Sequence, residues 1–281
     1  MQLFVSKYHG CGNDFIILRH SAVEDWNEEQ LKDFIVSVCD RHTGIGADGC
    51  IFVNEDPLEM IYYNQDGSRA DMCGNGIRCF AAYCSDEGLE DKGLYDVQTL
   101  AGTKTISVIS KDPFYCQIAM GKPDWDPKKI KTSNLQRLWN SPISTPFGDY
   151  EISSFYMSTI HTVLFEDEPF ADQWAAIGEA IGKHPLFEEQ TNVNFVKVLN
   201  DHEIEAATWE RGCGMTLACG TGMCASALCA LLQNKTGPHV DVHMKKGTLH
   251  IDIEKDQSVY LSGPAVKIME GIYEYEQKES A

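Results

Sequence analysis

Two cysteines occupy matching places in the chain, each directly before a glycine-rich turn. Cys73 opens the sequence Cys-Gly-Asn-Gly, and Cys219 opens Cys-Gly-Thr-Gly. Glycines let a ligand approach the backbone closely, and the first N–H groups of a helix that follows them form an anion site. We expect the pKa of each thiol to be lowered there, because the helix start stabilises its thiolate. Paired thiols of this kind predict acid/base chemistry.

Two thiols on opposite faces of one carbon can invert that carbon. Inversion by proton transfer needs a base on one face and an acid on the other, and a thiolate/thiol pair supplies both. The pair would titrate as one coupled unit that shares a proton. The glycine turns would donate backbone N–H groups to a substrate carboxylate as the α-proton leaves. The predicted activity is an amino-acid racemase or epimerase without pyridoxal, and we expect no cofactor.

The chain repeats itself at a shift of about 146 residues, close to half of its 281. The two cysteine turns correspond at this shift, and four other segments correspond in the same order. Such a series predicts two similar domains. We place the first domain at 1–120 plus the returning tail 264–281, and the second at 121–263. The other matching pairs are 13–15 with 159–161, 63–67 with 209–212, 102–108 with 247–253, and 118–123 with 261–264.

The hydrophobic pattern predicts helices and strands in both halves. Residues 27–38 have helical spacing after a cap-like Glu24-Asp25, and 171–181 repeat this amphipathic helix in the second half. The segments 76–85 and 222–232 are apolar nearly all round, which is typical of a helix enclosed by other structure. Strands are expected at 3–8, 15–19, 51–53 and 60–63, with several more over 97–118.

These elements indicate a mixed α/β fold, of the α+β kind. We predict two similar domains, each a curled, mostly antiparallel sheet around one central helix. Pseudo-twofold packing of the domains would bring the two cysteine turns face to face, with the active site in the cleft between them.

Composition and charge exclude several function classes. The chain has 23 Lys and Arg against 42 Asp and Glu, which gives a formal net charge of −19. Such a surface repels phosphate backbones and anionic lipids, so we expect neither nucleic acid nor a membrane as a partner. No signal peptide is expected at the N-terminus, and a cytoplasmic location is predicted. The expected partner is a small-molecule amino acid, and a homodimer is left open.

Eleven cysteines raise the question of disulfides and metals. An odd number argues against a fully paired disulfide framework. Zinc sites use Cys pairs two to four residues apart. Here the cysteines are spaced five or six residues apart, in one group at Cys73, Cys79 and Cys84 and in another at Cys219, Cys224 and Cys229. We therefore predict no metal site and expect most of the thiols to be buried packing residues.

Several longer motifs resemble the diaminopimelate epimerase family. The resemblance runs from residue 3 to about 266 and implies two α/β domains that interconvert LL- and meso-diaminopimelate without a cofactor. The motifs include Asn-Gln-Asp-Gly-Ser at 64–68, Met-Cys-Gly-Asn-Gly-Ile-Arg-Cys at 72–79, Trp-Glu-Arg-Gly at 209–212, Ala-Cys-Gly-Thr-Gly at 218–222, Gly-Cys-Gly-Asn-Asp-Phe at 10–15, Gly-Ile-Gly-Ala-Asp-Gly at 44–49, Thr-Asn-Val-Asn-Phe at 191–195 and Ser-Gly-Pro-Ala-Val at 262–266.

The resemblance also implies roles for individual residues. Cys73 and Cys219 match the acid/base pair, and the backbones at Gly74-Asn75 and Gly220-Thr221 match the groups that hold the reacting carboxylate. Arg and Asn donors suit a second carboxylate, and a Glu acceptor suits the second ammonium group. His161 could orient catalytic groups, although it could equally be a packed histidine. The matching substrate-contact residues are Asn13, Asn64, Asn192, Glu210 and Arg211; Asn64 and Asp66 could also serve only as turn residues.

Two departures from the family pattern concern recognition of the substrate. Thr159-Ile160-His161 stands where the family usually has Asn-Pro-His, and Met215 stands where it usually has Glu. These changes favour a second interpretation, a racemase of another free amino acid such as histidine. Diaminopimelate is favoured by Arg211, Asn64 and Asn192. A third interpretation is a non-catalytic amino-acid-binding or redox-sensing protein. Binding alone needs no second cysteine, and a redox protein more often has Cys-x-x-Cys.

Overall fold

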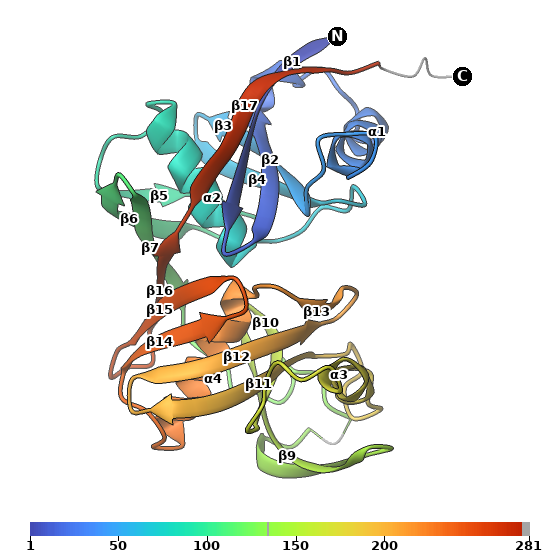
Figure 1. Ribbon diagram of the computed structural model, residues 1–281, viewed down its shortest axis with the longest axis vertical. Coiled ribbons are helices and arrows are strands. Elements are labelled where there is room, and N and C mark those ends of the chain that lie inside the picture. Colours follow the sequence, from blue (N-terminus) through green and yellow to red (C-terminus); the bar gives the residue numbers. More distant parts are fainter. Residues whose placement is uncertain (134, 277–281) are drawn as a thin grey trace. The chain divides into compact units, whose positions relative to one another are not determined.

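The computed structural model describes residues 1–133 and 135–276 and divides into two compact units (Figure 1). The first unit takes in Met1–Ile118 and the described residues from 263 onward, and the second takes in Ala119–Ser262. The chain passes from one unit to the other within strand β7 (Phe114–Gly121) and returns within strand β16 (Val259–Pro264).

The first unit contains a five-stranded sheet in the order β17-β1-β2-β3-β4. Strands β2 and β3 are parallel and are joined through helix α1, whereas the other neighbours are antiparallel. Strands β5 and β6 form an antiparallel meander with β7. The elements are β1 (Gln2–Gly10), β2 (Asn13–Arg19), the 3-10 helix η1 (His20–Ala22), α1 (Glu28–Cys39), β3 (Gly49–Glu55), β4 (Leu58–Asn64), α2 (Gly74–Asp86), β5 (Leu94–Val97), β6 (Lys104–Lys111) and β17 (Val266–Glu274).

Helices α1 and α2 pack on opposite faces of this sheet, as Figure 1 shows. Successive side chains of a strand point to opposite faces. Ile16 and Leu18 of β2 therefore join the core under α1, while Phe15 and Ile17 point the other way and are equally buried. Every residue of α2 from Gly74 to Cys84 is buried, so this helix is enclosed as its apolar sequence predicts.

The second unit has strands in the order β16-β15-β14-β12-β11-β10-β9-β8, with the short β13 paired to β12. Neighbours are antiparallel except the parallel pairs β10–β11 and β12–β14. Helix α3 packs on one face with the core around Trp174, and the buried α4 packs against β9, β10, β11 and β15. The elements are β8 (Leu138–Thr145), β9 (Gly148–Met157), β10 (Thr159–Phe165), α3 (Trp174–Gly182), β11 (Asn192–Asn200), β12 (Glu203–Glu210), β13 (Gly214–Thr216), α4 (Gly220–Leu232), β14 (His239–Met244) and β15 (Gly247–Ile253).

The two units share one order of elements. In each unit a parallel pair of strands is connected through an amphipathic helix, an antiparallel strand follows, and then comes the enclosed helix. The enclosed helices α2 and α4 begin at Gly74 and Gly220, which are 146 positions apart, as the sequence repeat predicts. The predicted mixed fold, with a mostly antiparallel sheet around a central helix in each half, is confirmed.

All four predicted helices begin one to three residues away from the predicted start, and the first turns of α1 and α3 show why. Helix α1 is capped by Asn27, whose side chain accepts from the Gln30 N–H while the Gln30 side chain accepts from the Asn27 N–H, and not by Glu24-Asp25. This reciprocal pair is a capping box. Helix α3 begins at Trp174 and not at 171, because residues 171–173 form a turn that precedes it.

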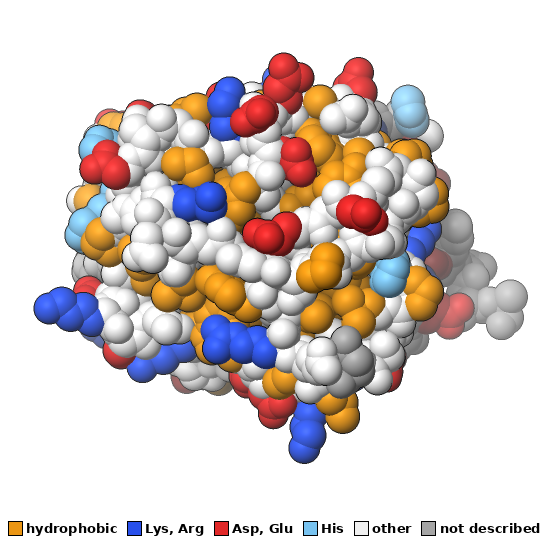
Figure 2. Space-filling model, turned by 90° about the horizontal axis from the view of Figure 1, so that it is seen from below, with side chains coloured by type: hydrophobic (Ala, Val, Ile, Leu, Met, Phe, Trp, Pro, Cys, Tyr) orange, Lys and Arg blue, Asp and Glu red, His pale blue; other side chains and the backbone are white. Residues whose placement is uncertain are grey.

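Most of the cysteines are buried, as expected from the composition. Figure 2 shows one face on which acidic, basic and hydrophobic side chains are interspersed. Within the described residues, no helix is long and apolar enough to cross a membrane. All eleven cysteines are free thiols: eight besides Cys219 are buried, Cys73 is half-buried and Cys213 is exposed.

Candidate active site

Each enclosed helix begins with a cysteine. Cys73 is the N-cap residue of α2 and Cys219 is the N-cap residue of α4, both with extended backbone angles. The carbonyl groups of these cysteines accept the first helical hydrogen bonds, from Ile77 N–H and Met223 N–H, at 2.9 Å in both helices. The first N–H groups of a helix lack partners within it and carry the positive end of the helix dipole. The chain thus places a thiol beside an anion site in each unit.

The glycines of these turns serve close packing rather than an unusual backbone conformation. Gly74, Gly76, Gly220 and Gly222 lie within the helices, and none of them has a positive φ. A Cβ at Gly222 would lie 2.4 Å from Asn194 Oδ1 and 2.8 Å from Thr208 Oγ1. The expected tight turn is therefore an ordinary first helical turn, and the missing side chains bring neighbouring strands against it.

The Cys73 site is held by an amide network. Asn13 Oδ1 accepts from Cys73 Sγ at 3.6 Å and from Asn75 Nδ2 at 3.2 Å. Asn13 Nδ2 donates to Asp48 Oδ2 at 2.7 Å, which fixes the orientation of the Asn13 amide. A carbonyl oxygen, not an amide nitrogen, therefore faces the thiol. The predicted residues Asn13, Cys73 and Asn75 are brought together in this unit.

Ion pairs of the buried Asp14 support the strand that carries Asn13. The Asp14 carboxylate contacts the Lys7 ammonium at 3.0 Å and the Arg41 guanidinium at 2.7 Å. Burial opposes the charge of Asp14, but hydrogen bonds from Arg41 and Lys7 outweigh it and hold the pKa of this carboxyl below its usual value. Arg41 also bonds to Asp48 at 2.7 Å, so the same guanidinium braces the carboxylate that orients Asn13.

Arg78 is a buried positive charge beneath the first turn of α2, and the sequence reasoning gave it no role. Its side chain is fully buried. The guanidinium donates to Gly74 O at 2.8 Å, to Asn75 Oδ1 at 2.9 Å and to Pro264 O at 3.2 Å. Arg78 therefore fixes the Asn75 amide and adds a cation to the anion site. Its position one turn after Gly74, in an otherwise apolar helix, was the signal that could have found it.

Asn64 is bonded to its own neighbours in the sequence. Its Nδ2 donates to Ser68 Oγ at 3.0 Å, and its Oδ1 accepts from Tyr62 OH at 2.9 Å. Asp66 Oδ1 accepts from Ser68 N–H at 2.8 Å, and Gly67 has a φ of +79°. Asp66 is thus the turn residue of the alternative interpretation. Asn64 lies at the end of β4, where that turn begins.

The Cys219 site is a chain of hydrogen bonds that leads to the thiol. Asn194 Nδ2 lies 3.1 Å from His161 Nδ1, His161 Nε2 lies 3.0 Å from Thr221 Oγ1, and Thr221 Oγ1 lies 3.5 Å from Cys219 Sγ. An amide N–H can only donate, so His161 Nδ1 accepts and its Nε2–H donates to Thr221. In the last contact of the chain, either the Thr221 hydroxyl or the Cys219 thiol can be the donor.

His161 is an uncharged member of this chain. It is fully buried, and burial, aided by the Arg211 cation, lowers its pKa to about 3. The imidazole therefore stays neutral near neutral pH and keeps a single tautomer. Asn194, which the sequence reasoning did not single out, fixes that tautomer, and Thr208 Oγ1 donates to Asn194 Oδ1 at 2.9 Å.

The expected lowering of the thiol pKa is wrong at Cys219. Burial raises the pKa of the Cys219 thiol well above its usual value, and the Glu210 carboxylate raises it further. Hydrogen bonds from the Thr221 hydroxyl and the Gly222 N–H act in the opposite direction but do not prevail. Cys219 is therefore a protonated thiol at neutral pH in this structure. Glu210 also accepts from Thr216 Oγ1, which orients its carboxylate.

Asn192, Arg211 and Thr159 form a second polar group in this unit. The Arg211 N–H donates to Asn192 Oδ1 at 3.0 Å, while the Arg211 guanidinium donates to Glu189 O at 3.0 Å and lies 3.5 Å from Thr159 Oγ1. Asn192 is paired in register with His161 across β10 and β11. The two departures from the family pattern lie on different sides of this site: Thr159 contacts Arg211, whereas Met215 lines a pocket.

That pocket has an empty volume of about 440 Å³ and reaches Cys219. Its wall is mostly apolar. Besides the Cys219 thiol, the polar side chains among its lining residues are those of Thr208, Thr216 and Lys245. Met215 is paired with Trp209 across β12 and β13 and forms part of this wall.

Comparisons with known proteins show which family and fold this chain resembles. The sequence profile described as diaminopimelate epimerase matches residues 5–125 and 154–268. Relatives named diaminopimelate epimerase include one from Alkaliphilus metalliredigens, 40% identical over 97% of this chain and 98% of the relative, and one from Pelotomaculum thermopropionicum, 37% identical over 96% and 98%. A Bacillus anthracis phenazine biosynthesis protein of the PhzF family has a similar fold, with a TM-score of 0.70, 14% identity and coverage of 98% and 100%.

Proposed function

We propose that this chain, which belongs to the diaminopimelate epimerase family, interconverts LL- and meso-diaminopimelate by moving a proton on and off one α-carbon. The observation that carries the proposal is the duplicated thiol environment, with Cys73 and Cys219 each the N-cap of an enclosed helix. A binding protein has no use for a second thiol at the equivalent place. A two-base inversion requires both.

In the proposed reaction one cysteine acts as the thiolate and removes the α-proton. The electron pair of the broken C–H bond is delocalised toward the substrate carboxylate, and the second cysteine delivers its own proton to the opposite face of the carbon. One thiolate becomes a thiol while one thiol becomes a thiolate, so protons and electrons balance. The reverse direction exchanges the two roles. This chemistry draws on protein side chains and uses no organic cofactor.

The helix starts would hold the reacting carboxylate. The N–H groups at Gly74-Asn75 and Gly220-Thr221 belong to the first turns that follow the two cysteines. Charge on the carboxylate increases as the α-proton leaves, and donors fixed in advance stabilise that charge without reorganising. Arg78 contributes a buried cation beneath one of these turns. The same two segments, 73–75 and 219–221, thus supply both the bases and the N–H groups of the anion site.

We assign the proton-donor role in the resting enzyme to Cys219. Burial and the Glu210 carboxylate raise the pKa of its thiol, so this sulfur carries a proton when the substrate arrives. The base in that direction would be Cys73, which is half-buried and must first lose the thiol hydrogen that it donates to Asn13 Oδ1. His161 and Glu210 act as positioning residues: His161 holds the Thr221 hydroxyl beside the sulfur, and Glu210 favours the protonated thiol.

The distal amino-acid group of diaminopimelate would be recognised by polar side chains. Arg211 and Asn192 can donate to the distal carboxylate, Glu210 can accept from an ammonium group, and Asn64 and Asn13 would supply further amide contacts. Thr159 favours a second candidate, a racemase of another polar amino acid such as histidine. Its hydroxyl contacts the Arg211 guanidinium and is shorter than the amide usual at this position. Arg211 itself favours diaminopimelate.

A screen of α-proton exchange separates these candidates. The full chain is incubated in deuterated water with LL-diaminopimelate and with a panel of free amino acids, and both deuterium incorporation and inversion are followed. We expect inversion of diaminopimelate to exceed that of every other substrate. Inversion of histidine or another amino acid alone would favour the second candidate, and no exchange with any amino acid would contradict both.

Replacing either thiol tests the two-base mechanism. We expect Cys73→Ala and Cys219→Ala each to lower the rate of inversion by about four orders of magnitude or more. A general acid or base contributes roughly 10²–10⁴-fold to a rate, and inversion at one carbon requires both the acid and the base. Cys213→Ala, the same change at an exposed thiol, is the matched control and should leave the rate unchanged. Full turnover with deuterium incorporation by either single active-site variant would rule the mechanism out.

The setting of the reaction is also proposed. The formal net charge of −19 supports a cytoplasmic enzyme whose partner is a free amino acid rather than nucleic acid or a membrane. A homodimer remains compatible with this function.

A further inference from the structure

The outward face of the β14–β15 hairpin carries histidines and aspartates at alternate positions. His239 and Asp241 lie on β14, while His250 and Asp252 lie on β15. The register pairs His239 with Asp252 and Asp241 with His250. The intervening residues, such as Val240 and Ile251, are fully buried, so the pleat directs all four polar side chains to the same, outer face.

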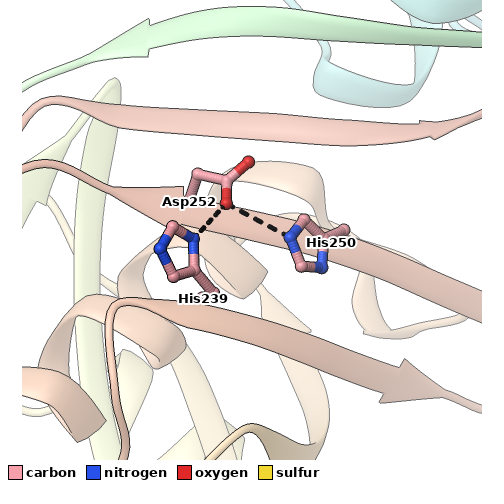
Figure 3. A group of neighbouring side chains, drawn as sticks. All are labelled: His239, His250 and Asp252. Carbon is pink, nitrogen blue, oxygen red and sulfur yellow. Dashed lines mark hydrogen bonds and ion pairs between the residues drawn. The ribbon is translucent and has the colours of Figure 1, made fainter. Parts of the chain in front are cut away.

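Three of these side chains converge on one point, as Figure 3 shows. His239 Nδ1 lies 2.6 Å from Asp252 Oδ1, and His250 Nε2 lies 3.2 Å from the same oxygen. One ligand atom from each residue lies within 4.8 Å of the other two. Donor atoms bound to one zinc ion at about 2.0–2.2 Å lie roughly 3–3.5 Å apart, so small side-chain rotations would suffice.

Asp241 gives His250 the environment of a metal ligand. His250 Nδ1 lies 2.7 Å from Asp241 Oδ1, so its N–H donates to that carboxylate. Histidines that bind metals almost always donate their other ring N–H to a carboxylate or carbonyl group in this way. The bond fixes the ring and leaves Nε2 facing Asp252. If His250 is neutral and its Nδ1 carries the hydrogen, the lone pair of Nε2 faces the Asp252 carboxylate oxygen. Two electron-rich atoms repel each other at this distance, so a proton or a cation between them would be stabilising.

The cluster favours positive charge. The His250 ring lies between two carboxylates, with Asp241 Oδ1 2.7 Å from Nδ1 and Asp252 Oδ1 3.2 Å from Nε2. A proton supplies this charge, and so does a divalent ion. Two imidazole nitrogens and one carboxylate oxygen suit zinc and its neighbours among the transition metals, whereas calcium and magnesium prefer oxygen ligands alone.

We propose that His239, His250 and Asp252 bind one divalent transition-metal ion of the zinc class, with Asp241 orienting His250. The ion would replace the protons that now lie between the ligand atoms. Because its ligands come from two adjacent strands, it would tie β14 to β15 at the end of the hairpin away from the turn at 245–246. The site is separate in chemistry from the Cys219 site, which contains thiol, hydroxyl and amide groups.

Calorimetric titration of the full chain with Zn²⁺, repeated with Co²⁺ for its absorption spectrum, tests the site. We expect one equivalent to bind, with a Co²⁺ spectrum that lacks the thiolate charge-transfer band a cysteine ligand would produce. His250→Ala should abolish this binding, and Asp241→Asn should weaken it by about 10- to 100-fold. His202→Ala is the matched control, because His202 is an exposed histidine beside an aspartate in another turn and should bind normally.

A second readout keeps the test independent of any single variant. The ion should raise the thermal unfolding midpoint of the wild-type chain but not of His239→Ala, whose exposed side chain can be removed without disturbing the core. Equal binding by wild type, His239→Ala and His250→Ala would overturn the proposal, as would a thiolate spectrum or no binding at millimolar ion. The cluster would then be an imidazolium held between two carboxylates.

Discussion

Cys219 illustrates how opposed effects decide the protonation state of one residue. The helix start, the Gly222 N–H and the Thr221 hydroxyl all favour the thiolate, yet burial and Glu210 raise the pKa of the thiol. Desolvation of a buried charge can shift a pKa by several units, whereas a neutral hydrogen bond contributes about 1 kcal/mol, or less than one unit. The thiol form therefore prevails, and the hydrogen bonds moderate a shift that would otherwise be larger.

Thr221→Val should make the Cys219 thiol less acidic. The change keeps the side-chain shape but removes the hydroxyl, whose hydrogen bond lowers the pKa of the Cys219 thiol, so that pKa should increase. At a fixed pH below that pKa, less thiolate is present, and alkylation of Cys219 should slow by about 3- to 10-fold. Mass spectrometry of iodoacetamide-labelled peptides at several pH values measures this rate residue by residue.

Thr221→Ser is the matched control for that change. It retains the hydroxyl group and should restore alkylation close to the wild-type rate. Labelling of the exposed Cys213 in the same samples shows whether the reagent or the folded state has changed. Equal alkylation rates for wild type and Thr221→Val would show that the hydroxyl does not act on Cys219.

The proposed acid/base residues can be recognised from the sequence, whereas the residues that position them cannot. Cys73 and Cys219 are recognisable because the repeat places the same turn twice. Arg78 and Asn194 are not, since their roles come from bonds to segments that are distant in the sequence. The pKa of Cys219 was wrongly predicted for a related reason: burial depends on the whole fold around a residue, not on its neighbours in sequence.

At the scale of elements, the enclosed helices could be predicted and some helix ends could not. An apolar sequence on every side forces α2 and α4 into the interior whatever surrounds them. The start of α1 depends on one local competition, and Asn27 with Gln30 makes a better cap than Glu24-Asp25 because both side chains bond reciprocally. The enclosed helices also begin two residues earlier than predicted, since their glycines keep helical backbone angles.

Gly222→Ala should push helix α4 away from the strands that position His161. The new Cβ would lie 2.4 Å from Asn194 Oδ1 and 2.8 Å from Thr208 Oγ1, closer than real side chains come. Alanine gains up to about 1 kcal/mol of helix propensity, but overpacking typically costs roughly 1–3 kcal/mol. We expect a net loss in the free energy of unfolding, measured by urea denaturation, together with a lower inversion rate.

Substitution of a second glycine shows whether the loss of stability in Gly222→Ala comes from the contact of α4 with Asn194 and Thr208. Gly93 has no atom within 4 Å of its would-be Cβ and no positive φ. Gly93→Ala should therefore leave both stability and activity within about 0.5 kcal/mol of wild type, as surface substitutions usually do. If Gly222→Ala were as stable and active as Gly93→Ala, the close approach of Asn194 to α4 would not matter.

At the scale of the whole molecule, the duplication gives each unit one cysteine at the start of an enclosed helix, beside an anion site. Neither unit alone holds both bases, so the proposed inversion requires the two units to act on one substrate. The acidic charge adds little to this, because a zwitterionic amino acid needs no long-range attraction. It is best understood as a contribution to solubility. The eleven cysteines likewise divide into two with proposed chemistry, eight that are buried and the exposed Cys213.

Mild oxidation tests whether Cys73 and Cys219 meet across one substrate position. If they do, hydrogen peroxide should remove two electrons and two protons from the thiols, join them as a disulfide and be reduced to water. Activity should be lost almost completely and return with dithiothreitol. Peptide mapping should find Cys73 linked to Cys219, and Cys213→Ala should be inactivated at the wild-type rate. A disulfide needs Cα atoms within about 7 Å, so this link cannot form between distant thiols. Full activity after peroxide, with both thiols still open to alkylation, would contradict the meeting of the two cysteines, and so would inactivation by a sulfinic acid on one cysteine without the link.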